Sequence, residues 1–397
     1  MNFKLLSVLP IIPIHSSVIL TLLLIPFSCT DHVNQDDVAE VLKGSIIKNA
    51  VWAMAQGPET ITSFHAARSE GGLHDFYSEG DYWWPNPVNP EGPYLRRDGE
   101  TNPDNFVAHR LSMIRFSKIV GYLTSAFLIT GDEMYVEHAF KHINAWFVDP
   151  ATRMNPNLLY AQAIKGVVSG RGIGIIDTIH LMEVAQGIYR MQNASPVDQK
   201  NLEKVKDWFK EYISWLTTHP YGVDEMNAKN NHATCWVMQV ASFAKLVGEQ
   251  KVMDFCRKRY KEVLLPDQMA EDGSFPREIA RTKPYGYSLF NLDAMVTICQ
   301  ILSTEEDNLW EYSTRSTLNI KKGVDFLFPF IINKASWPYE KDVMYWEEWP
   351  IAQPALVFAS LYFNDPVIFN VWKSLNHEIT HPEVDRNCPI RNPLIWI

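Results

Sequence analysis

The chain of 397 residues has few cysteines and no excess of basic residues. Its five cysteines form no Cys-X-X-Cys pair and show no spacing from histidine typical of zinc ligands. The formal net charge is −10, whereas proteins that bind nucleic acids normally present a basic face to the phosphates. The sequence therefore predicts no metal site, no cofactor and no nucleic-acid partner, but an anionic substrate remains compatible with a local cluster of arginines.

The middle of the chain also lacks glycine- and proline-rich linkers, and it lacks convincing alternation of apolar and polar residues. Apolar residues recur instead at i, i+3 and i+4, the period of an amphipathic helix. This period predicts helices over residues 105–130, 132–148, 174–192, 199–219, 232–247, 252–264, 287–302 and 309–330.

Short turns separate these helices, as expected of antiparallel helical hairpins. The sequence thus predicts an all-α fold, an α/α toroid built as an incomplete barrel of about six to seven hairpins. One domain would span residues 38–397. An α-solenoid is the alternative, although no fixed repeat period is visible.

Residues 1–28 have the layout of an export signal, with Lys4 ahead of a long apolar run and Ser28 before Cys29. A cysteine after a small residue at this point is typical of bacterial lipoproteins, so Cys29 is expected to carry the lipid. Prolines within the run weaken the alternative of an uncleaved membrane-spanning anchor. The expected location is the periplasm or the outer membrane, with the lipid or the signal segment as the only membrane contact.

Residues 78–105, SEGDYWWPNPVNPEGPYLRRDGETNPDN, combine aromatic and arginine residues with many prolines and glycines. Aromatic faces stack on sugar rings, and arginine binds carboxylates through two parallel hydrogen bonds. A rigid surface loop packed on the core has the same composition. The candidate binding residues are Tyr82, Trp83, Trp84, Arg96 and Arg97. A second aromatic segment, residues 337–350, is expected to place its tryptophans in the core.

Asn230, Asn231 and His232 stand together where a helix is predicted to begin. Asparagine is a common helix cap, which is one explanation for this group. A helix N-terminus also stabilises a nearby anion, and amide and imidazole donors at that position would bind a carboxylate.

A second polar group follows within residues 271–292, where Arg281 precedes Tyr285 and Tyr287. A neighbouring cation lowers the pKa of a phenol, so a tyrosine here is a candidate proton carrier. β-Elimination from a 4-linked uronic acid requires such a set of groups. Donors neutralise the carboxylate as the C5 proton leaves, and a tyrosine takes that proton or gives one to the departing O4.

The motifs SGRGIGIID, WFKEYISWL, NNHATCW and DGSFPREIAR followed by YGY occur in this order. Together they resemble the alginate lyase superfamily of helical-toroid polysaccharide lyases, which includes branches acting on mannuronan and glucuronan. The similarity covers residues 82–302. It implies that Asn231 and His232 contact the substrate carboxylate, that Arg281 assists, and that Tyr287 is both acid and base. His232 shares the proton abstraction if the stereochemistry at C5 requires it.

The sequence is compatible with alternatives for two residues and for the activity. The step from Arg281 to Tyr287 departs from the mannuronan branch, so Tyr285 remains a candidate for the site. Arg171 in SGRGIGIID either adds a carboxylate-binding corner or belongs to a tight turn fixed by glycines. The predicted activity is cleavage of alginate, mannuronan or glucuronan by β-elimination. The alternatives are a non-catalytic glycan-binding lipoprotein and a toroidal glycoside hydrolase with two carboxylates.

Overall fold

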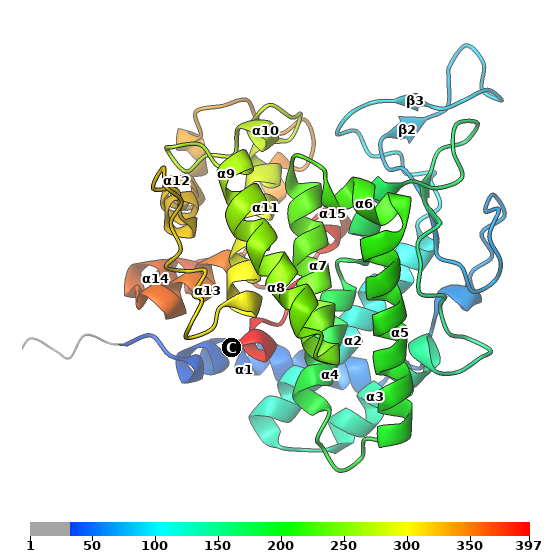
Figure 1. The fold of residues 1–397 in the computed structure, drawn as a ribbon, viewed down its shortest axis with the longest axis horizontal. Coiled ribbons are helices and arrows are strands. Elements are labelled where there is room, and N and C mark those ends of the chain that lie inside the picture. The colour runs from blue at the N-terminus through cyan, green and yellow to red at the C-terminus, as the bar shows by residue number, and fades with distance from the viewer. Residues whose placement is uncertain (1–31) are drawn as a thin grey trace, which may run out of the picture. The chain divides into compact units, whose positions relative to one another are not determined.

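The computed structural model describes residues 32–397, and these cluster into one unit. The predicted signal peptide, residues 1–28, and Cys29 lie outside the described residues. The described chain is mainly helical, with fifteen α-helices and four short strands (Figure 1). None of its helices combines the length and the apolar character needed to cross a membrane.

The helices differ widely in length, from four residues to 23. In chain order they are α1 (Gln35–Met54), α2 (Ala108–Thr130), α3 (Met134–Phe147), α4 (Leu181–Met191), α5 (Gln199–Thr218), α6 (Pro220–Met226), α7 (Asn231–Val247), α8 (Gln250–Arg259), α9 (Leu265–Gln268), α10 (Pro276–Ile279), α11 (Pro284–Leu302), α12 (Ile320–Ile332), α13 (Pro354–Phe363), α14 (Pro366–Ser374) and α15 (Pro382–Arg386).

Five of these helices, α2, α4, α7, α11 and α13, pack one against the next and form an inner row. The helices α1, α3, α5, α8, α12 and α14 pack on the outside of this row, mostly as the partners of helical hairpins. The C-terminal 3₁₀ helix η6 (Pro393–Trp396) contacts α2, α4 and α13, and so lies between the two ends of the inner row. The arrangement confirms the predicted all-α toroid.

Burial explains why the sequences of the inner helices are almost uniformly apolar. In α11 nearly every residue is buried, because neighbours cover it on all sides. The outer helix α5 has one buried face, which includes Trp208 and Tyr212, and an exposed charged face. Trp337 and Trp349 of the second aromatic segment are buried, as expected, whereas Trp346 is only partly buried and packs against the core.

Two of the predicted helical segments are shorter in the structure. Residues 309–330 were expected to be one helix, but α12 begins only at Ile320 because Thr317 adopts a φ of 63° and Asn319 caps the helix. Residues 174–192 divide into the 3₁₀ helix η2 (Gly172–Thr178) and α4.

The structure also contains two small sheets that the hydrophobic pattern did not predict. Strand β1 (Tyr77–Glu79) pairs in parallel with β4 (Tyr160–Ala163), and β2 (Trp83–Trp84) pairs antiparallel with β3 (Leu95–Arg96). Strands of two to four residues are too short to show alternation in a sequence. The β2–β3 pair folds the long loop into a hairpin at the edge of the domain (Figure 1).

Candidate active site

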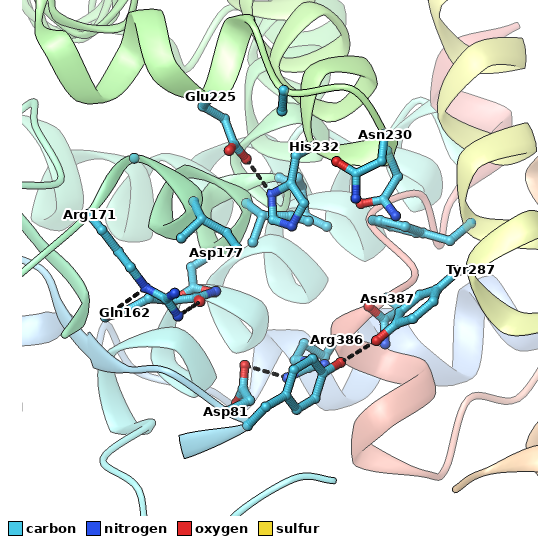
Figure 2. Close-up of a pocket in the computed structure, with 18 of the residues that line it drawn as sticks. Asp81, Gln162, Arg171, Asp177, Glu225, Asn230, His232, Tyr287, Arg386 and Asn387 are labelled. Carbon is cyan, nitrogen blue, oxygen red and sulfur yellow. Dashed lines mark hydrogen bonds and ion pairs between the residues drawn. The ribbon is translucent and has the colours of Figure 1, made fainter. Parts of the chain in front are cut away.

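A cavity of about 500 Å³ opens where the N-termini of the neighbouring inner helices α7 and α11 meet the β2–β3 hairpin and α15. Figure 2 shows side chains that enter it from several directions, with Glu225 and His232 opposite Asp81 and Arg386, and Arg171 opposite Tyr287. The predicted site residues that line it are Tyr82, Trp83, Arg96, Arg171, Asn230, Asn231, His232, Arg281 and Tyr287.

Each of the two helices is capped by a carboxylate from elsewhere in the chain. Glu278 accepts hydrogen bonds from the backbone N–H and the side-chain Nδ2 of Asn231, both at 2.7 Å. Asp342 accepts from the backbone N–H groups of Tyr285 and Gly286, at 2.8 and 2.9 Å. A carboxylate stabilises the free N–H groups and the positive end of a helix. These caps fix the first turns that carry Asn231 and Tyr287.

Glu278 also determines how Asn231 presents its amide. Because Nδ2 already donates to Glu278, the second amide hydrogen and Oδ1 are left for a ligand. Burial raises the pKa of Glu278, although the hydrogen bonds from Asn231 oppose this change. A protonated Glu278 accepts less well, so the orientation of Asn231 depends on ionised Glu278.

His232 is oriented by Glu225, a buried residue of α6. Its Nδ1 lies 2.6 Å from Oε1 of Glu225 (Figure 2). An ionised carboxylate only accepts hydrogen bonds, so the proton of a neutral imidazole resides on Nδ1. The lone pair on Nε2 of His232 is then available to accept a proton.

Tyr287 lies on the opposite side of the cavity and is hydrogen-bonded to Tyr82, with 2.7 Å between the two hydroxyl oxygens. The guanidinium carbon of Arg281 lies 4.7 Å from the ring centroid of Tyr287. Burial raises the pKa of Tyr287 well above its usual value, and Tyr82 raises it further, while Arg281 opposes both effects. Arg281 thus acts in the expected direction, but burial has the larger effect, so the net change in the pKa of Tyr287 is upward. Tyr287 is a protonated phenol at neutral pH.

Arg281 is paired with a carboxylate of the long loop. Its Nη2 and Nε lie 3.1 and 3.3 Å from the oxygens of Asp98, which also pairs with Arg96. Burial opposes ionisation of Asp98, but the hydrogen bond and charge of Arg281 prevail and lower its pKa. Arg281, which was predicted to assist at a substrate carboxylate, is thus already bound to Asp98.

Arg171 lies at another side of the cavity, above Trp83, with 5.8 Å between its guanidinium carbon and the ring centroid. Its Nε and Nη2 donate to the backbone carbonyl and Oε1 of Gln162, at 2.9 and 3.0 Å. Both acceptors are neutral, so Arg171 has no direct ion pair; burial lowers its pKa, although the charge of Asp177 opposes this change. The adjacent Gly170 has a structural role, because a Cβ there would lie 1.8 Å from the carbonyl oxygen of Leu159.

Three predicted binding residues do not line the cavity. Tyr285 is fully buried, and its hydroxyl donates to the carbonyl of Phe330 at 3.1 Å. Trp84 and Arg97 pack on each other, with 4.8 Å between the guanidinium carbon and the ring centroid. Side chains alternate between the two faces of a hairpin. Trp83 and its cross-strand partner Arg96 therefore face the cavity, whereas Trp84 and Arg97 do not.

The cavity also contains residues that were not predicted. Asp81 pairs with Arg110 at 2.7 Å and with Arg386 at 2.5 Å, and Asn387 follows Arg386 along the wall. Glu225 lies seven positions before His232, on the preceding short helix. These residues carry no local sequence signal, because only the tertiary fold brings them to the site.

The β2–β3 hairpin places Arg96 in the cavity and leaves Arg97 outside it, so the two adjacent arginines should differ in function. Arg96→Ala is expected to raise KM for a polyuronate by about tenfold with a smaller change in kcat, because it removes a contact present in both the ground state and the transition state. Arg97→Ala is the matched control and should leave both constants near those of the wild type. Steady-state kinetics of the two variants test this expectation, and equal effects of both would contradict the assigned faces.

Among residues 32–397, no group of three His, Cys, Asp or Glu side chains is arranged to hold a metal ion. We expect turnover to persist after treatment with a chelator, because Asn231, together with Arg281 once it exchanges Asp98 for the substrate, can neutralise a substrate carboxylate without a cation. Rates measured before and after exhaustive dialysis against EDTA test this. Loss of activity that a divalent cation restores would contradict it.

A comparison with protein families and a comparison with solved structures both find alginate lyases. The family model described as alginate lyase matches residues 60–337. The crystal structure of an alginate lyase from Bacteroides ovatus is 29% identical and has a TM-score of 0.79, over 91% of this chain and 97% of that chain. Alginate lyase A1-III from Sphingomonas species A1 is 14% identical with a TM-score of 0.51, over 80% of this chain and 85% of that chain.

A variant of alginate lyase A1-III complexed with a tetrasaccharide is 15% identical to this chain, with a TM-score of 0.53, over 79% of this chain and 84% of that chain. At this identity the likeness concerns the fold alone. No curated protein sequence matches the chain.

Proposed function

Because the chain belongs to the alginate lyase family and is a polysaccharide lyase, we propose that it cleaves 4-linked polyuronates of the alginate, mannuronan or glucuronan type by β-elimination. The observation that supports this most directly is the convergence of two groups on one cavity. Asn231 and His232 enter from the start of α7, Tyr287 from the first turn of α11, and Arg281 from the segment just before α11.

In this mechanism the substrate carboxylate lies near the N-terminus of α7. The free amide hydrogen of Asn231 and the guanidinium of Arg281 donate to its oxygens. Arg281 exchanges Asp98 for the substrate carboxylate, or binds both. Negative charge grows on the carboxylate as the C5 proton leaves, so these donors stabilise the transition state more than the bound substrate.

Each of the two proton transfers is assigned to the group that suits it: Nε2 of His232 has a free lone pair, and Tyr287 carries a proton. Nε2 of His232 takes the C5 proton, and the electrons of the C5–H bond form the C4=C5 double bond. The C4–O4 bond breaks, and the hydroxyl of Tyr287 gives its proton to O4. A substrate with its C5 proton on the face of Tyr287 would require the phenolate of Tyr287 to act as base as well, against the raised pKa of that group.

A hydrolase would need two available carboxylates across the cavity. Three of the four acidic residues that line it have other partners, since Glu225 holds His232, Asp81 pairs with two arginines, and Asp177 accepts from Ser78 at 2.5 Å. A binding protein without activity would have no use for the Glu225–His232 pair. Both alternatives are therefore less well supported than the lyase.

Incubation with a panel of polysaccharides tests the substrate class. Purified protein is mixed with polymannuronate, polyguluronate, glucuronan and a neutral β-glucan as control, and ultraviolet absorbance of the conjugated C4=C5 product is recorded. Absorbance should rise with at least one uronate and not with the neutral polymer. The absence of product from every uronate would contradict the proposed function.

We also propose that the protein is exported and lipidated at Cys29, as its first 29 residues indicate. Metabolic labelling with a palmitate analogue should mark the wild type, and Cys29→Ser should abolish the label. A labelled Cys29→Ser variant, or an unlabelled wild type, would contradict lipidation at this residue.

A further inference from the structure

The C-terminal helix α15 reaches the catalytic cavity although it lies outside residues 60–337, which match the family model. Arg386 and Asn387 line the cavity, and Figure 2 shows both beside Tyr287. Neither residue takes part in the proposed proton transfers or in binding the substrate carboxylate. Arg386 nevertheless lies beside the hydrogen-bonded pair Tyr82 and Tyr287.

Arg386 belongs to a buried ionic cluster that joins α15 to the segment of Tyr287. Glu383 accepts from Nζ of Lys283 at 2.8 Å and lies 3.1 Å from Nη2 of Arg386. Arg386 also pairs with Asp81, which Arg110 binds through two nitrogens at 2.7 and 2.9 Å. Glu383 is thus paired with two cations, Lys283 and Arg386.

The two cations that Glu383 holds face the tyrosine pair. Nζ of Lys283 lies 5.1 Å from the ring centroid of Tyr82 and 5.7 Å from that of Tyr287. Burial opposes the charge of Arg386, but Asp81 and Glu383, followed by Tyr82 and Tyr287, raise its pKa. Burial likewise opposes the charge of Lys283, but Tyr82 and Glu383 raise its pKa. Both cations are therefore charged and largely removed from water, where their field is weakly screened.

We propose that Lys283 and Arg386, held by Glu383, are positioning residues that stabilise the phenolate formed when Tyr287 protonates the leaving group. The inference rests on the proposed function and deepens it. As the C4–O4 bond breaks, O4 takes the hydroxyl proton and the electron pair of the O–H bond stays on Tyr287. Tyr82 then donates its hydrogen bond to this oxygen, and the two cations balance the new charge. A proton from solvent restores the phenol.

The structure supplies a matched control on the same helix. Lys118 pairs with Asp385 of α15 at 2.5 Å but does not line the cavity. Lys118→Met removes an ionic anchor of α15 and leaves the tyrosine pair untouched. A role of Arg386 in anchoring the helix alone would therefore give both variants similar kinetics.

The test compares two substrates that differ in their need for an acid. One is the polyuronate, and the other is an oligouronide with fluoride at C4 of its non-reducing end, since fluoride leaves without a proton. Arg386→Gln should lower kcat on the polyuronate by about 10²-fold with KM little changed, as for loss of one donor to a developing oxyanion. On the fluoride substrate the loss should stay below about threefold. Arg386→Lys should restore most of the activity, and Lys118→Met should match the wild type on both substrates.

Removal of Arg386 leaves Glu383 and Asp81 with one fewer partner, so folding is checked by circular dichroism and thermal unfolding. The double variant Glu383→Gln/Arg386→Gln removes one charge of each sign and should show the same substrate-dependent loss. Equal losses on both substrates, or no loss in a folded variant, would overturn the inference while the lyase function stands. A wild type inactive on every polyuronate would overturn both.

Discussion

Replacement of Tyr287 by phenylalanine is expected to lower kcat on a polyuronate by about 10²- to 10⁴-fold, the range typical of acid–base groups. The variant keeps the ring and its contact with Arg281 but loses the hydroxyl that bonds to Tyr82. Folding should be preserved, because the hydroxyl of Tyr287 faces the cavity. Steady-state kinetics together with circular dichroism provide the measurement.

Tyr285→Phe is the matched control for this variant. Its hydroxyl bonds to a backbone carbonyl in the core, so we expect near-normal turnover and a small loss of stability of about 1 kcal/mol. A folded Tyr287→Phe enzyme with normal turnover would refute the assignment. An inactive Tyr285→Phe enzyme would transfer the role to that residue.

The raised pKa of Tyr287 also predicts a pH dependence. A general acid is active when protonated, so its contribution is lost as the pH rises through its pKa. Because burial moves this pKa above the ordinary value, kcat should show no decline due to Tyr287 below a pH of about 10. Wild-type kcat measured from neutral to alkaline pH, with unfolding monitored in parallel, tests this. A decline near neutral pH that Tyr287→Phe abolishes would contradict it.

Replacement of His232 by alanine should lower kcat by a similar factor of about 10² or more, since it removes the proposed base. Glu225→Gln is the more informative variant, because it keeps the shape of the carboxyl group and removes its charge. The amide of glutamine can either accept from Nδ1 of His232 or donate to it, so it no longer enforces the tautomer with the proton on Nδ1. A base in the wrong tautomer loses activity, so kcat should fall by about 10- to 100-fold.

The same pair of variants distinguishes the proposed base from a simple donor. A histidine that only donates to the substrate carboxylate needs its proton on Nε2, and Glu225→Gln would then preserve activity. Near-normal kcat in both the folded Glu225→Gln and the folded His232→Ala enzyme would therefore show that His232 is not the base. It would leave Tyr287 as the single residue for both proton transfers.

The sequence predicts the part of the site that depends on local structure. Asn231 and His232 stand at the start of a helix because the helical period begins there, and helix starts favour anion contacts. Tyr285 and Tyr287 are two positions apart on a helix and so point to different faces, which means that only one reaches the cavity. The sequence alone does not show which of the two faces the cavity.

The rest of the site depends on contacts between distant segments. Glu278 orients Asn231 across 47 positions, and Asp342 caps the helix of Tyr287 through the N–H of Tyr285, 57 positions away. Arg386 reaches the site through its ion pair with Asp81, far away in the sequence. The upward net shift in the pKa of Tyr287 has the same origin, because the burial that outweighs Arg281 is a property of the folded cavity.

The measurement that tests the central claim most directly compares two products of one reaction. Cleavage of a polyuronate by the full chain is followed by the new reducing ends and by the unsaturated C4=C5 ends, counted in the same samples. β-Elimination predicts one unsaturated end for every new reducing end throughout the reaction, and none of either in the doubly substituted Tyr287→Phe/His232→Ala enzyme. New reducing ends without unsaturated ends would show hydrolysis and contradict the account.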